Sequence, residues 1–295
     1  MERLIIDTHA HIFPSKIATK AVKNIGNFYG IEMDGSGEID YLLEHGKKAG
    51  VTHFIVCSSA TTSAQVHSIN EFILREISDK NNVFGLGALH PDLSDEELDA
   101  AIDFITSNDL IGVKLHPDFQ RFNIDDKAAY RIYERCEGKL PILFHTGDER
   151  YDFSAPQRLA KVAKDFPNLK CIGAHFGGYS RWAEIDCYLG LDNVYFDTSS
   201  ALFKLTPKDA KDMIEKLGED KFMFGVDFPM WEHSEEMERF EKLGLTETQK
   251  DKILFKNAIK FYGLEKLLKW KSQAKKTIIA IENFVCKIVN FHLKK

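Results

Sequence analysis

The sequence predicts an α/β protein, a (β/α)8 TIM barrel with a helical extension at its C-terminal end. Eight short apolar runs recur along the 295 residues, and each is followed by a polar turn and a segment with helical periodicity. The runs mostly lack alternation of polar and apolar residues, which is typical of parallel strands covered by helices on both faces. Eight such units in about 260 residues match the length of a (β/α)8 barrel.

The eight predicted strands are these apolar runs. They cover residues 4–9, 53–58, 83–89, 112–116, 142–145, 171–175, 194–197 and 222–227. A doubly wound open sheet is the alternative arrangement of such units. Its Gly-rich phosphate turn after the first strand is missing, because the chain has His9-Ala10-His11 at that place.

Signals for helix starts lie between the strands. Ser94 and Thr246 are each followed three residues later by Glu or Gln, which is the spacing of a capping box, and Thr206 precedes a proline as an N-cap residue does. The longest irregular stretch, residues 13–37, contains four glycines. We predict that it forms a loop over the barrel mouth, ahead of a helix over residues 39–48.

Composition indicates an ordinary globular protein. The net charge of -6 gives no reason to expect nucleic acid or an anionic membrane as the main partner. The five cysteines are scattered without CxxC spacing, which argues against a disulfide framework and a thiolate zinc site. The start of the chain lacks a signal-peptide pattern and no apolar run reaches the length of a membrane span, so we expect a cytoplasmic protein.

The chain divides into a barrel domain, residues 1–263, and a C-terminal segment, residues 264–295. The segment holds eight lysines and two glutamates, a net charge of +6, and its apolar residues recur at helical spacing. It is predicted to be a basic amphipathic helix. Packing on the acidic barrel or on the partner subunit of a homodimer is favoured over binding to a membrane surface.

Polar residues gather at the ends of five predicted strands, where a barrel of this kind carries its catalytic groups. His9 and His11 stand two apart on a strand and therefore point to the same side. Burying several imidazoles and carboxylates together is costly unless a cation organises them. Nitrogen and oxygen ligands without thiolate favour Zn²⁺, with Mn²⁺ or Fe²⁺ as alternatives. The strand ends are residues 7–11, 114–117, 145–148, 175–178 and 227–229.

These segments resemble the amidohydrolase superfamily of metal-dependent barrels. The closer likeness is to its second large branch, which includes aminocarboxymuconate-semialdehyde decarboxylase and related decarboxylases, hydratases and lactone hydrolases. The likeness extends over residues 1 to 262. The matching segments are IIDTHAHIFP (5–14), GVKLHPDFQ (112–120), ILFHTGD (142–148), IGAHFGG (172–178) and FGVDFP (224–229).

The resemblance implies a role for each strand-end residue. It makes His9, His11, His145 and Asp227 metal ligands, with Asp227 also the general base. His175 would bind a second metal or activate the water. Lys114 lies where two-metal members carry a carboxylated lysine that bridges the ions, whereas one-metal decarboxylases lack this lysine, so one ion and two both remain open.

The expected activity is a hydrolase that attacks a small ester, lactone or amide with metal-activated water. The alternative is a non-oxidative decarboxylase or hydratase of a small carboxylic acid on the same site, and a barrel that binds without turnover is a third possibility. Intact proton-transfer groups at Asp227 and His175 count against the third. Lys114 favours a two-metal hydrolase, and the ending Asp227-Phe228-Pro229 favours the decarboxylase branch.

Further residues near the strand ends are candidate substrate contacts. His116 shares a face with Lys114, and Arg150 and Arg181 lie in loops where a cation can clamp a carboxylate. Aromatic residues are candidates for apolar pocket walls. These are Phe13, Phe119, Tyr151, Trp182 and Trp231. His45, His53, His67, His233 and His292 are assigned to the surface or to helix faces.

Overall fold

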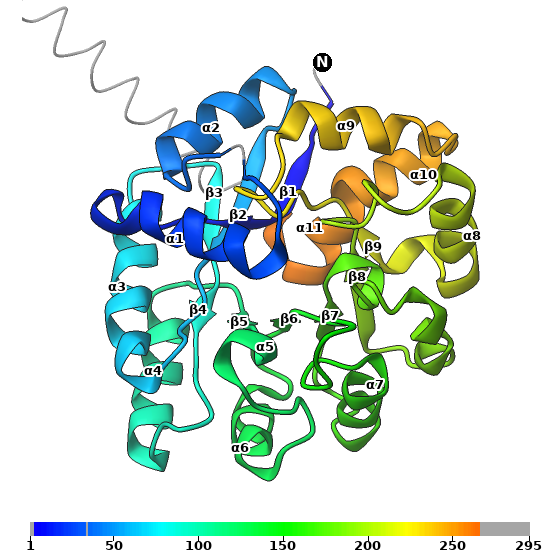
Figure 1. Ribbon diagram of the computed structural model, residues 1–295. Coiled ribbons are helices and arrows are strands. Elements are labelled where there is room, and N and C mark those ends of the chain that lie inside the picture. Colours follow the sequence, from blue (N-terminus) through cyan, green and yellow to red (C-terminus); the bar gives the residue numbers. More distant parts are fainter. Residues whose placement is uncertain (1–2, 34, 266–295) are drawn as a thin grey trace, which may run out of the picture.

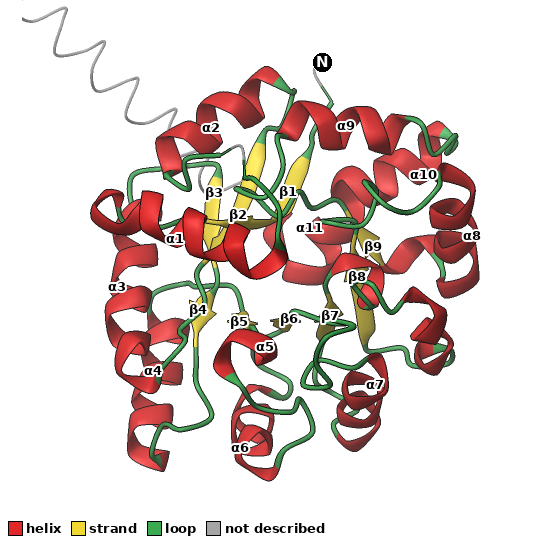
Figure 2. Cartoon of the chain, in the orientation of Figure 1, coloured by secondary structure: helices red, strands yellow, loops and turns green. Residues whose placement is uncertain are grey.

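The computed structural model describes residues 3–33 and 35–265. Parallel strands lie at the centre and helices surround them, which confirms the predicted (β/α)8 barrel (Figures 1 and 2). The predicted C-terminal helix lies outside the described residues, apart from residues 264 and 265. No helix in the described part of the chain is long and apolar enough to cross a membrane.

The strands are short and all pair in parallel. They are β1 (Ile6–His11), β2 (His53–Cys57), β3 (Val83–Gly85), β4 (Gly87–Ala88), β5 (Val113–Leu115), β6 (Ile142–Phe144), β7 (Cys171–Gly173), β8 (Val194–Asp197) and β9 (Phe222–Met223). The strand order is β1-β2-β3 in one sheet and β4 to β9 in the other.

Backbone hydrogen bonds join the two sheets into one barrel. The predicted strand 83–89 is divided at Leu86, where the chain changes partner. The Leu86 N–H donates to Val56 O at 2.9 Å, and the Gly87 N–H donates to Gly112 O at 2.9 Å. On the other side, the Thr8 N–H donates to Phe224 O at 2.9 Å, so the segment after β9 lies against β1 and closes the ring.

The helices surround the barrel, most of them on its outer side (Figure 1). They are α1 (Ser15–Tyr29), α2 (Ile39–Lys48), α3 (Val66–Ile77), α4 (Asp95–Ser107), α5 (Pro117–Gln120), α6 (Lys127–Cys136), α7 (Pro156–Asp165), α8 (Pro207–Leu217), α9 (His233–Glu241), α10 (Glu247–Asp251) and α11 (Asn257–Tyr262). Shorter turns are η1 (Ser63–Gln65), η2 (His175–Gly177), η3 (Trp182–Tyr188), η4 (Glu219–Lys221) and the π-helical η5 (Lys252–Lys256). Ser94 and Thr246 form the predicted capping boxes, and Thr206 caps α8.

The prediction of a loop over residues 13–37 was wrong, because α1 occupies most of this stretch. Its glycines serve close packing and termination. A Cβ on Gly26 would stand 2.7 Å from the Ile31 carbonyl oxygen, so the helix needs glycine there. Gly30 ends α1 with a φ of 67°, a left-handed conformation that favours glycine.

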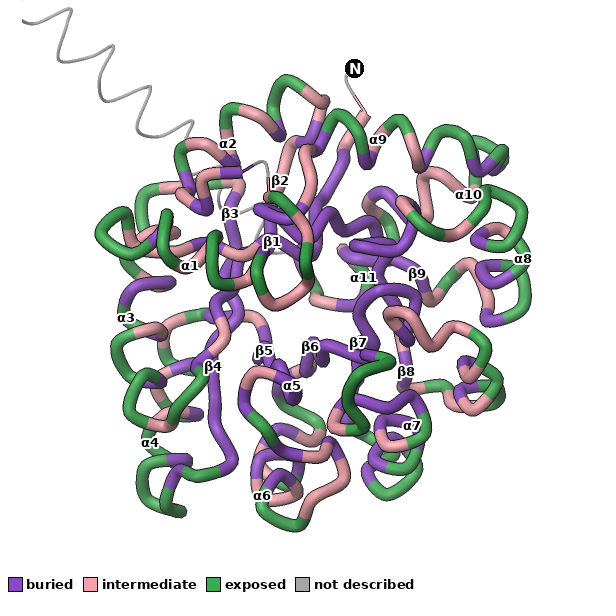
Figure 3. Tube along the Cα trace, viewed as in Figure 1, coloured by how far each residue is buried: buried purple, intermediate pink, exposed green. Residues whose placement is uncertain are grey.

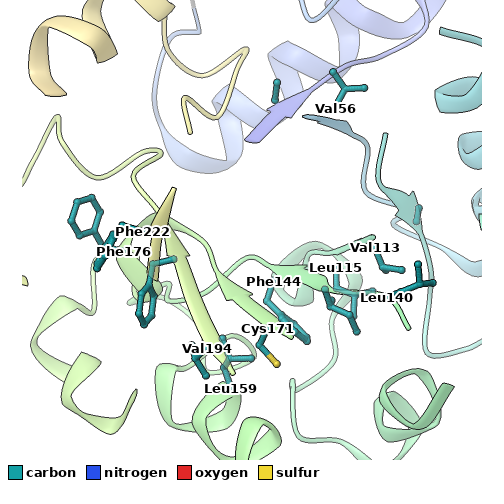
Figure 4. Packing of buried hydrophobic residues seen from close by; sticks show 14 of the residues in the cluster. Val56, Val113, Leu115, Leu140, Phe144, Leu159, Cys171, Phe176, Val194 and Phe222 are labelled. Atoms are coloured by element: carbon teal, nitrogen blue, oxygen red, sulfur yellow. The ribbon is translucent and has the colours of Figure 1, made fainter. Parts of the chain in front are cut away.

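Strand residues alternate between two environments. Val113 and Leu115 point outward and belong to the large apolar cluster between strands and helices, part of which appears in Figure 4. A smaller cluster lies inside, where Ile55, Leu143 and others fill the barrel below the site. Figure 3 shows the buried central strands and the exposed outer sides of the helices. Lys114 lies between Val113 and Leu115, so this alternation places its side chain inside the barrel.

Candidate metal centre

Four of the predicted strand-end residues form the floor of a cavity of about 580 Å³. His11, His116, His145 and Asp227 line this floor. Helix α1 lies over this end of the barrel (Figure 1) and supplies one wall of the same cavity. The segment predicted to cover the mouth therefore does so, as a helix rather than a loop.

Three potential ligand atoms form a triangle at the floor. His9 Nε2 lies 3.2 Å from His11 Nε2, and each lies 3.4 Å from Asp227 Oδ1. Two ligands about 2.1 Å from one ion and at a tetrahedral angle stand about 3.4 Å apart. The spacing of these atoms therefore fits a shared divalent metal ion.

A carboxylate from β8 sets the orientation of the His9 ring. Asp197 Oδ2 lies 2.9 Å from His9 Nδ1, and because a carboxylate only accepts, Nδ1 must carry the hydrogen. The Nε2 lone pair is therefore left to face the cavity floor. Burial and the charge of Lys114 lower the pKa of His9 to about 4, which keeps the ring neutral at pH 7. Orientation of this kind is typical of histidines that bind metal.

Asp197 joins several parts of the site through its other oxygen. Asp197 Oδ1 accepts hydrogen bonds from the backbone N–H groups of His175 at 3.0 Å and Ser199 at 3.1 Å, and from Ser199 Oγ at 2.5 Å. Burial alone would raise the pKa of Asp197, but His9, His175 and the Ser199 hydroxyl together outweigh it and lower the pKa to about 2. The carboxylate is therefore ionised at neutral pH.

His145 and His175 form a second pair of potential ligands. His175 Nε2 lies 3.0 Å from His145 Nδ1, so two ring nitrogens face each other. The carbonyl oxygen of Ser199 accepts from His175 Nδ1 at 3.1 Å, so the His175 Nε2 lone pair faces His145. Burial lowers the pKa of both histidines, so both rings are neutral.

Lys114 is buried beside these groups, with 1% of its surface exposed. Its Nζ lies 3.1 Å from His9 Nε2, and no carboxylate of the described residues forms a hydrogen bond with it. Burial lowers the pKa of this amine. Its charge also contributes to the lowered pKa values of His9, His145 and His175. Lys114 therefore contacts the triangle through His9 and acts electrostatically on His145 and His175.

Asp227 is held by its backbone and by a hydroxyl. Its φ is 67°, an uncommon value for a residue with a Cβ, and its backbone N–H donates to His9 O at 2.7 Å. Ser200 Oγ donates to Asp227 Oδ2 at 2.5 Å, and Trp231 Nε1 donates to Ser200 Oγ at 2.9 Å. Oδ1 is thereby directed at the two histidines of β1.

Tyr29, at the end of α1, contacts His116 on the cavity wall. Tyr29 OH and His116 Nε2 are 3.2 Å apart. The His116 ring stacks between Phe119 and His145, with centroid distances of 3.7 and 4.0 Å. Asp118 lies on the same side, with Oδ2 3.5 Å from His145 Nε2, and burial raises its pKa to about 6.

The two predicted arginine contacts are engaged elsewhere. Arg150 Nη2 lies 2.6 Å from Asp148 Oδ2, and its guanidinium lies over the Phe28 ring at 4.4 Å. Arg181 pairs with Glu184 at 2.7 Å and Asp152 at 3.1 Å. Neither arginine is among the described residues that line the cavity. Of the predicted aromatic walls, Phe13 and Phe119 line it, whereas Tyr151, Trp182 and Trp231 do not.

The assignment of His233 to a surface or helix face was wrong in one respect, since it is fully buried although it begins α9. Its Nε2 lies 3.0 Å from Asp7 Oδ2. Asp7 Oδ1 also accepts from the backbone N–H groups of His9 and Val226, each at 3.0 Å. This carboxylate fastens β1 to the segment that carries Asp227.

Sequence reasoning missed Asp197 and Tyr29. Asp197 ends a predicted strand, so the strand-end rule that found the histidines would have found it too. Tyr29 gave no such signal, because its segment was taken for a loop. Besides the triangle of His9, His11 and Asp227, the described residues include three groups whose potential ligand atoms lie within 4.8 Å of one another. They are His9, His11 and Cys57; His9, His175 and Asp197; and His116, Asp118 and His145.

A (β/α)8 barrel with buried imidazoles and a carboxylate at its mouth defines a barrel enzyme with a candidate metal centre. The chain belongs to the amidohydrolase family, whose model matches residues 6–264. This agrees with the resemblance seen in the sequence. A search of curated proteins gave no match.

Solved structures with the same fold include proteins of different activities. An uncharacterized TIM-barrel protein from Bordetella bronchiseptica is 20% identical, with a TM-score of 0.72 over 91% of this chain and 99% of that one. A dihydroxybenzoic acid decarboxylase from Polaromonas, with bound manganese and the inhibitor 2-nitroresorcinol, is 17% identical (TM-score 0.66, 89% and 97%). A candidate 2-pyrone-4,6-dicarboxylic acid hydrolase from Pseudomonas putida is 16% identical (TM-score 0.61, 90% and 99%).

Proposed function

We propose that this protein is a metal-dependent hydrolase of a small ester, lactone or amide. The observation that carries the proposal is the placement of Lys114, which is buried without a carboxylate partner among the described residues, contacts one set of facing ligand atoms through His9 and influences the pKa values of a second set. One set is His9, His11 and Asp227, and the other is His145 and His175. Nitrogen and oxygen donors of this kind suit Zn²⁺, with Mn²⁺ as the alternative.

The residues fit one divalent ion at the first set and a second at the histidine pair. Lys114 would join the two sets as a carboxylated lysine. Its lowered pKa favours the uncharged amine, which adds CO₂ with formation of an N–C bond and release of one proton. The resulting carbamate offers the anionic oxygens that a two-ion site needs. When bound, a divalent metal supplies Lewis-acid chemistry, polarising a carbonyl and making water acidic enough to ionise near pH 7.

Asp227 moves the proton in this mechanism. Its Oδ1 faces the floor, and the Ser200 hydroxyl on Oδ2 prevents the carboxylate from rotating away. The hydrogen bond to His11 and the neighbouring His9 and His175 outweigh burial and hold the pKa of Asp227 well below its usual range. Asp227 is therefore ionised at neutral pH, and its Oδ1 is placed where it can accept the proton of the attacking water and return it to the leaving group.

Tyr29 is suited to hold the reacting oxygen of the substrate. The Phe119 backbone N–H donates to His116 Nδ1 at 3.4 Å, so the neutral ring carries its hydrogen on Nε2. That hydrogen points to the Tyr29 oxygen, which leaves the phenolic O–H free to donate. Tyr29 lines the cavity, so its hydroxyl can donate to a carbonyl or leaving-group oxygen there.

A decarboxylase is the second candidate, favoured by the Asp227-Phe228-Pro229 ending and by the fold shared with the manganese-containing decarboxylase. In that reaction the bond between the substrate carbon and its carboxylate breaks, CO₂ leaves, and a proton is delivered to the carbon. The same acid and base groups serve both reactions.

Metal analysis combined with a substrate screen tests the proposal. Protein purified without chelator is analysed for metal as wild type and as Asp227→Asn and Lys114→Ala, and is assayed with esters, lactones and small aromatic acids. We expect about two ions in the wild type, one after Lys114→Ala, and hydrolysis rather than CO₂ release. One ion that is unaffected by Lys114→Ala, together with CO₂ release, would favour the decarboxylase. Absence of bound metal under every loading condition would refute both candidates.

A further inference from the structure

The cavity above the candidate metal centre has mainly apolar walls. Helix α1 contributes Ile17, Ile25 and Phe28, and α3 contributes Ile69 and Phe72. Its volume of about 580 Å³ lies in the range of sites for small molecules. The ionisable groups among the described lining residues all lie at the floor or its edge. They are His11, His116, His145, Asp227 and the phenol of Tyr29. The cavity therefore carries its ionisable groups at one end and is uncharged and mainly apolar over the rest.

No arginine or lysine occurs among the described residues that line this cavity. The nearby guanidinium of Arg150 lies against Phe28, and its Nε and Nη2 donate to the two oxygens of Asp148 at 2.9 and 2.6 Å. Arg181 is likewise paired with Glu184 and Asp152. Both arginines are therefore neutralised by their own neighbours, which leaves the walls without a cation for an anionic substituent.

One wall position offers an uncharged hydrogen bond. Ser59 lines the cavity, and its buried Oγ has no hydrogen-bond partner among the described residues. Buried hydroxyls are normally paired, so this one is available to a polar atom of a bound molecule. Ser58, Thr61, Gln65 and Ser68 line the same side and carry no charge.

We propose that the substrate has one polar reacting group and an otherwise uncharged, mainly apolar body. The reacting group would lie at the floor, and an aryl or alkyl body would fill the space between α1 and α3. A second carboxylate on that body would be buried against apolar side chains without a cation, which is strongly unfavourable. The inference rests on the proposed function, because the floor is taken as the reacting end.

A matched pair of esters tests this inference. 4-Nitrophenyl butyrate and the monoester 4-nitrophenyl succinate differ at the end of the acyl chain, a methyl group in one and a carboxylate in the other. We expect kcat/KM for the butyrate to exceed that for the succinate by roughly 100-fold, after correction for uncatalysed hydrolysis. This ratio is insensitive to unproductive binding of the carboxylate at the floor. Equal values, or a preference for the succinate, would overturn the inference.

A variant supplies the missing charge. Ile17 lines the cavity and is 50% exposed, so a polar residue there should not disturb folding. Ile17→Lys should lower the ratio of kcat/KM for the butyrate to kcat/KM for the succinate at least fivefold. Ile17→Gln removes the apolar side chain without adding charge and should leave this ratio within twofold of the wild-type value. An equal change in both variants would contradict the electrostatic reasoning.

A binding measurement separates this inference from the proposed function. If neither ester is hydrolysed, the proposed hydrolase activity fails, and affinity decides the inference. Metal-free protein is titrated with ethyl benzoate and with monoethyl terephthalate, and binding is followed by ligand-detected NMR. We expect ethyl benzoate to bind at least tenfold more tightly. Equal binding, tighter binding of the terephthalate, or no binding of either would refute the inference.

Discussion

Replacing Asp197 by Asn tests how the site is organised. The carboxylate accepts from His9 Nδ1 at 2.9 Å, and this contact directs the Nε2 lone pair of His9 to the floor. An Asn amide nitrogen at that position donates and cannot accept, so the contact is lost or the His9 hydrogen moves to Nε2. Either change removes a potential ligand without touching the atoms at the floor.

The expected loss follows from this geometry. Loss of a carboxylate that orients a metal-binding histidine lowers metal affinity by about 10- to 100-fold, or about 1.4 to 2.8 kcal/mol. The Asn side chain keeps the Oδ1 contacts with the backbone N–H groups of His175 and Ser199, so the loop after β7 should hold its conformation. The effect should therefore appear in metal affinity more than in folding.

Competition with a chromophoric chelator measures Zn²⁺ affinity, and circular dichroism checks folding. Asp192→Asn, at an exposed position in the loop before β8, is the matched control and should bind metal as the wild type does. A folded Asp197→Asn protein with wild-type affinity would refute the reasoning, because His9 would then need no orienting carboxylate.

Three further predictions concern other residues. Tyr29→Phe removes one hydrogen-bond donor to the reacting oxygen, so it should lower kcat about 100- to 1000-fold with little change in metal content. Steady-state kinetics and metal analysis measure both quantities, and an unchanged kcat would contradict this role. Burial raises the pKa of Glu236 to about 7, above its unfolded value of 4.5, so it contributes stability below pH 4.5 that is lost as the pH rises through 7. Between pH 5 and 8 the free energy of unfolding should therefore fall by up to about 3 kcal/mol less in Glu236→Gln than in the wild type, as measured by urea titration. An equal fall in both proteins would contradict this. Adding EDTA should lower the Tm of the metal-loaded wild type more than it lowers the Tm of Asp227→Asn, because the variant lacks one potential ligand. Differential scanning fluorimetry measures both decreases.

The strand pattern was readable from the sequence because buried parallel strands are continuous apolar runs. Seven of the predicted strands appear as single strands, and the run 83–89 is divided only because Leu86 changes its pairing partner. The helix α1 was not readable in the same way. Its glycines resembled loop residues, while Gly26 in fact serves a close contact with Ile31 that depends on how the chain folds back.

The placement of the candidate ligands could also be predicted from the sequence. His9, His11, His145, His175 and Asp227 follow strands, and parallel strands in a barrel bring their C-terminal ends to one mouth. The contacts of Arg150 and Arg181 could not be predicted from the sequence. Both lie in loops, and whether a loop cation faces the cavity or a neighbouring carboxylate depends on side-chain paths that periodicity does not encode.

The sequence by itself determined the barrel, the mouth and the residue types that meet there, because strand alternation and strand direction are local properties. Only the tertiary structure decided which nitrogen of each ring faces the floor, that Lys114 is buried beside His9, and that the walls carry no free cation among the described residues. These features depend on contacts such as that between Asp197 and His9, 188 residues apart in the chain. Contacts at that separation follow from the closed ring of strands, which brings distant segments to one floor.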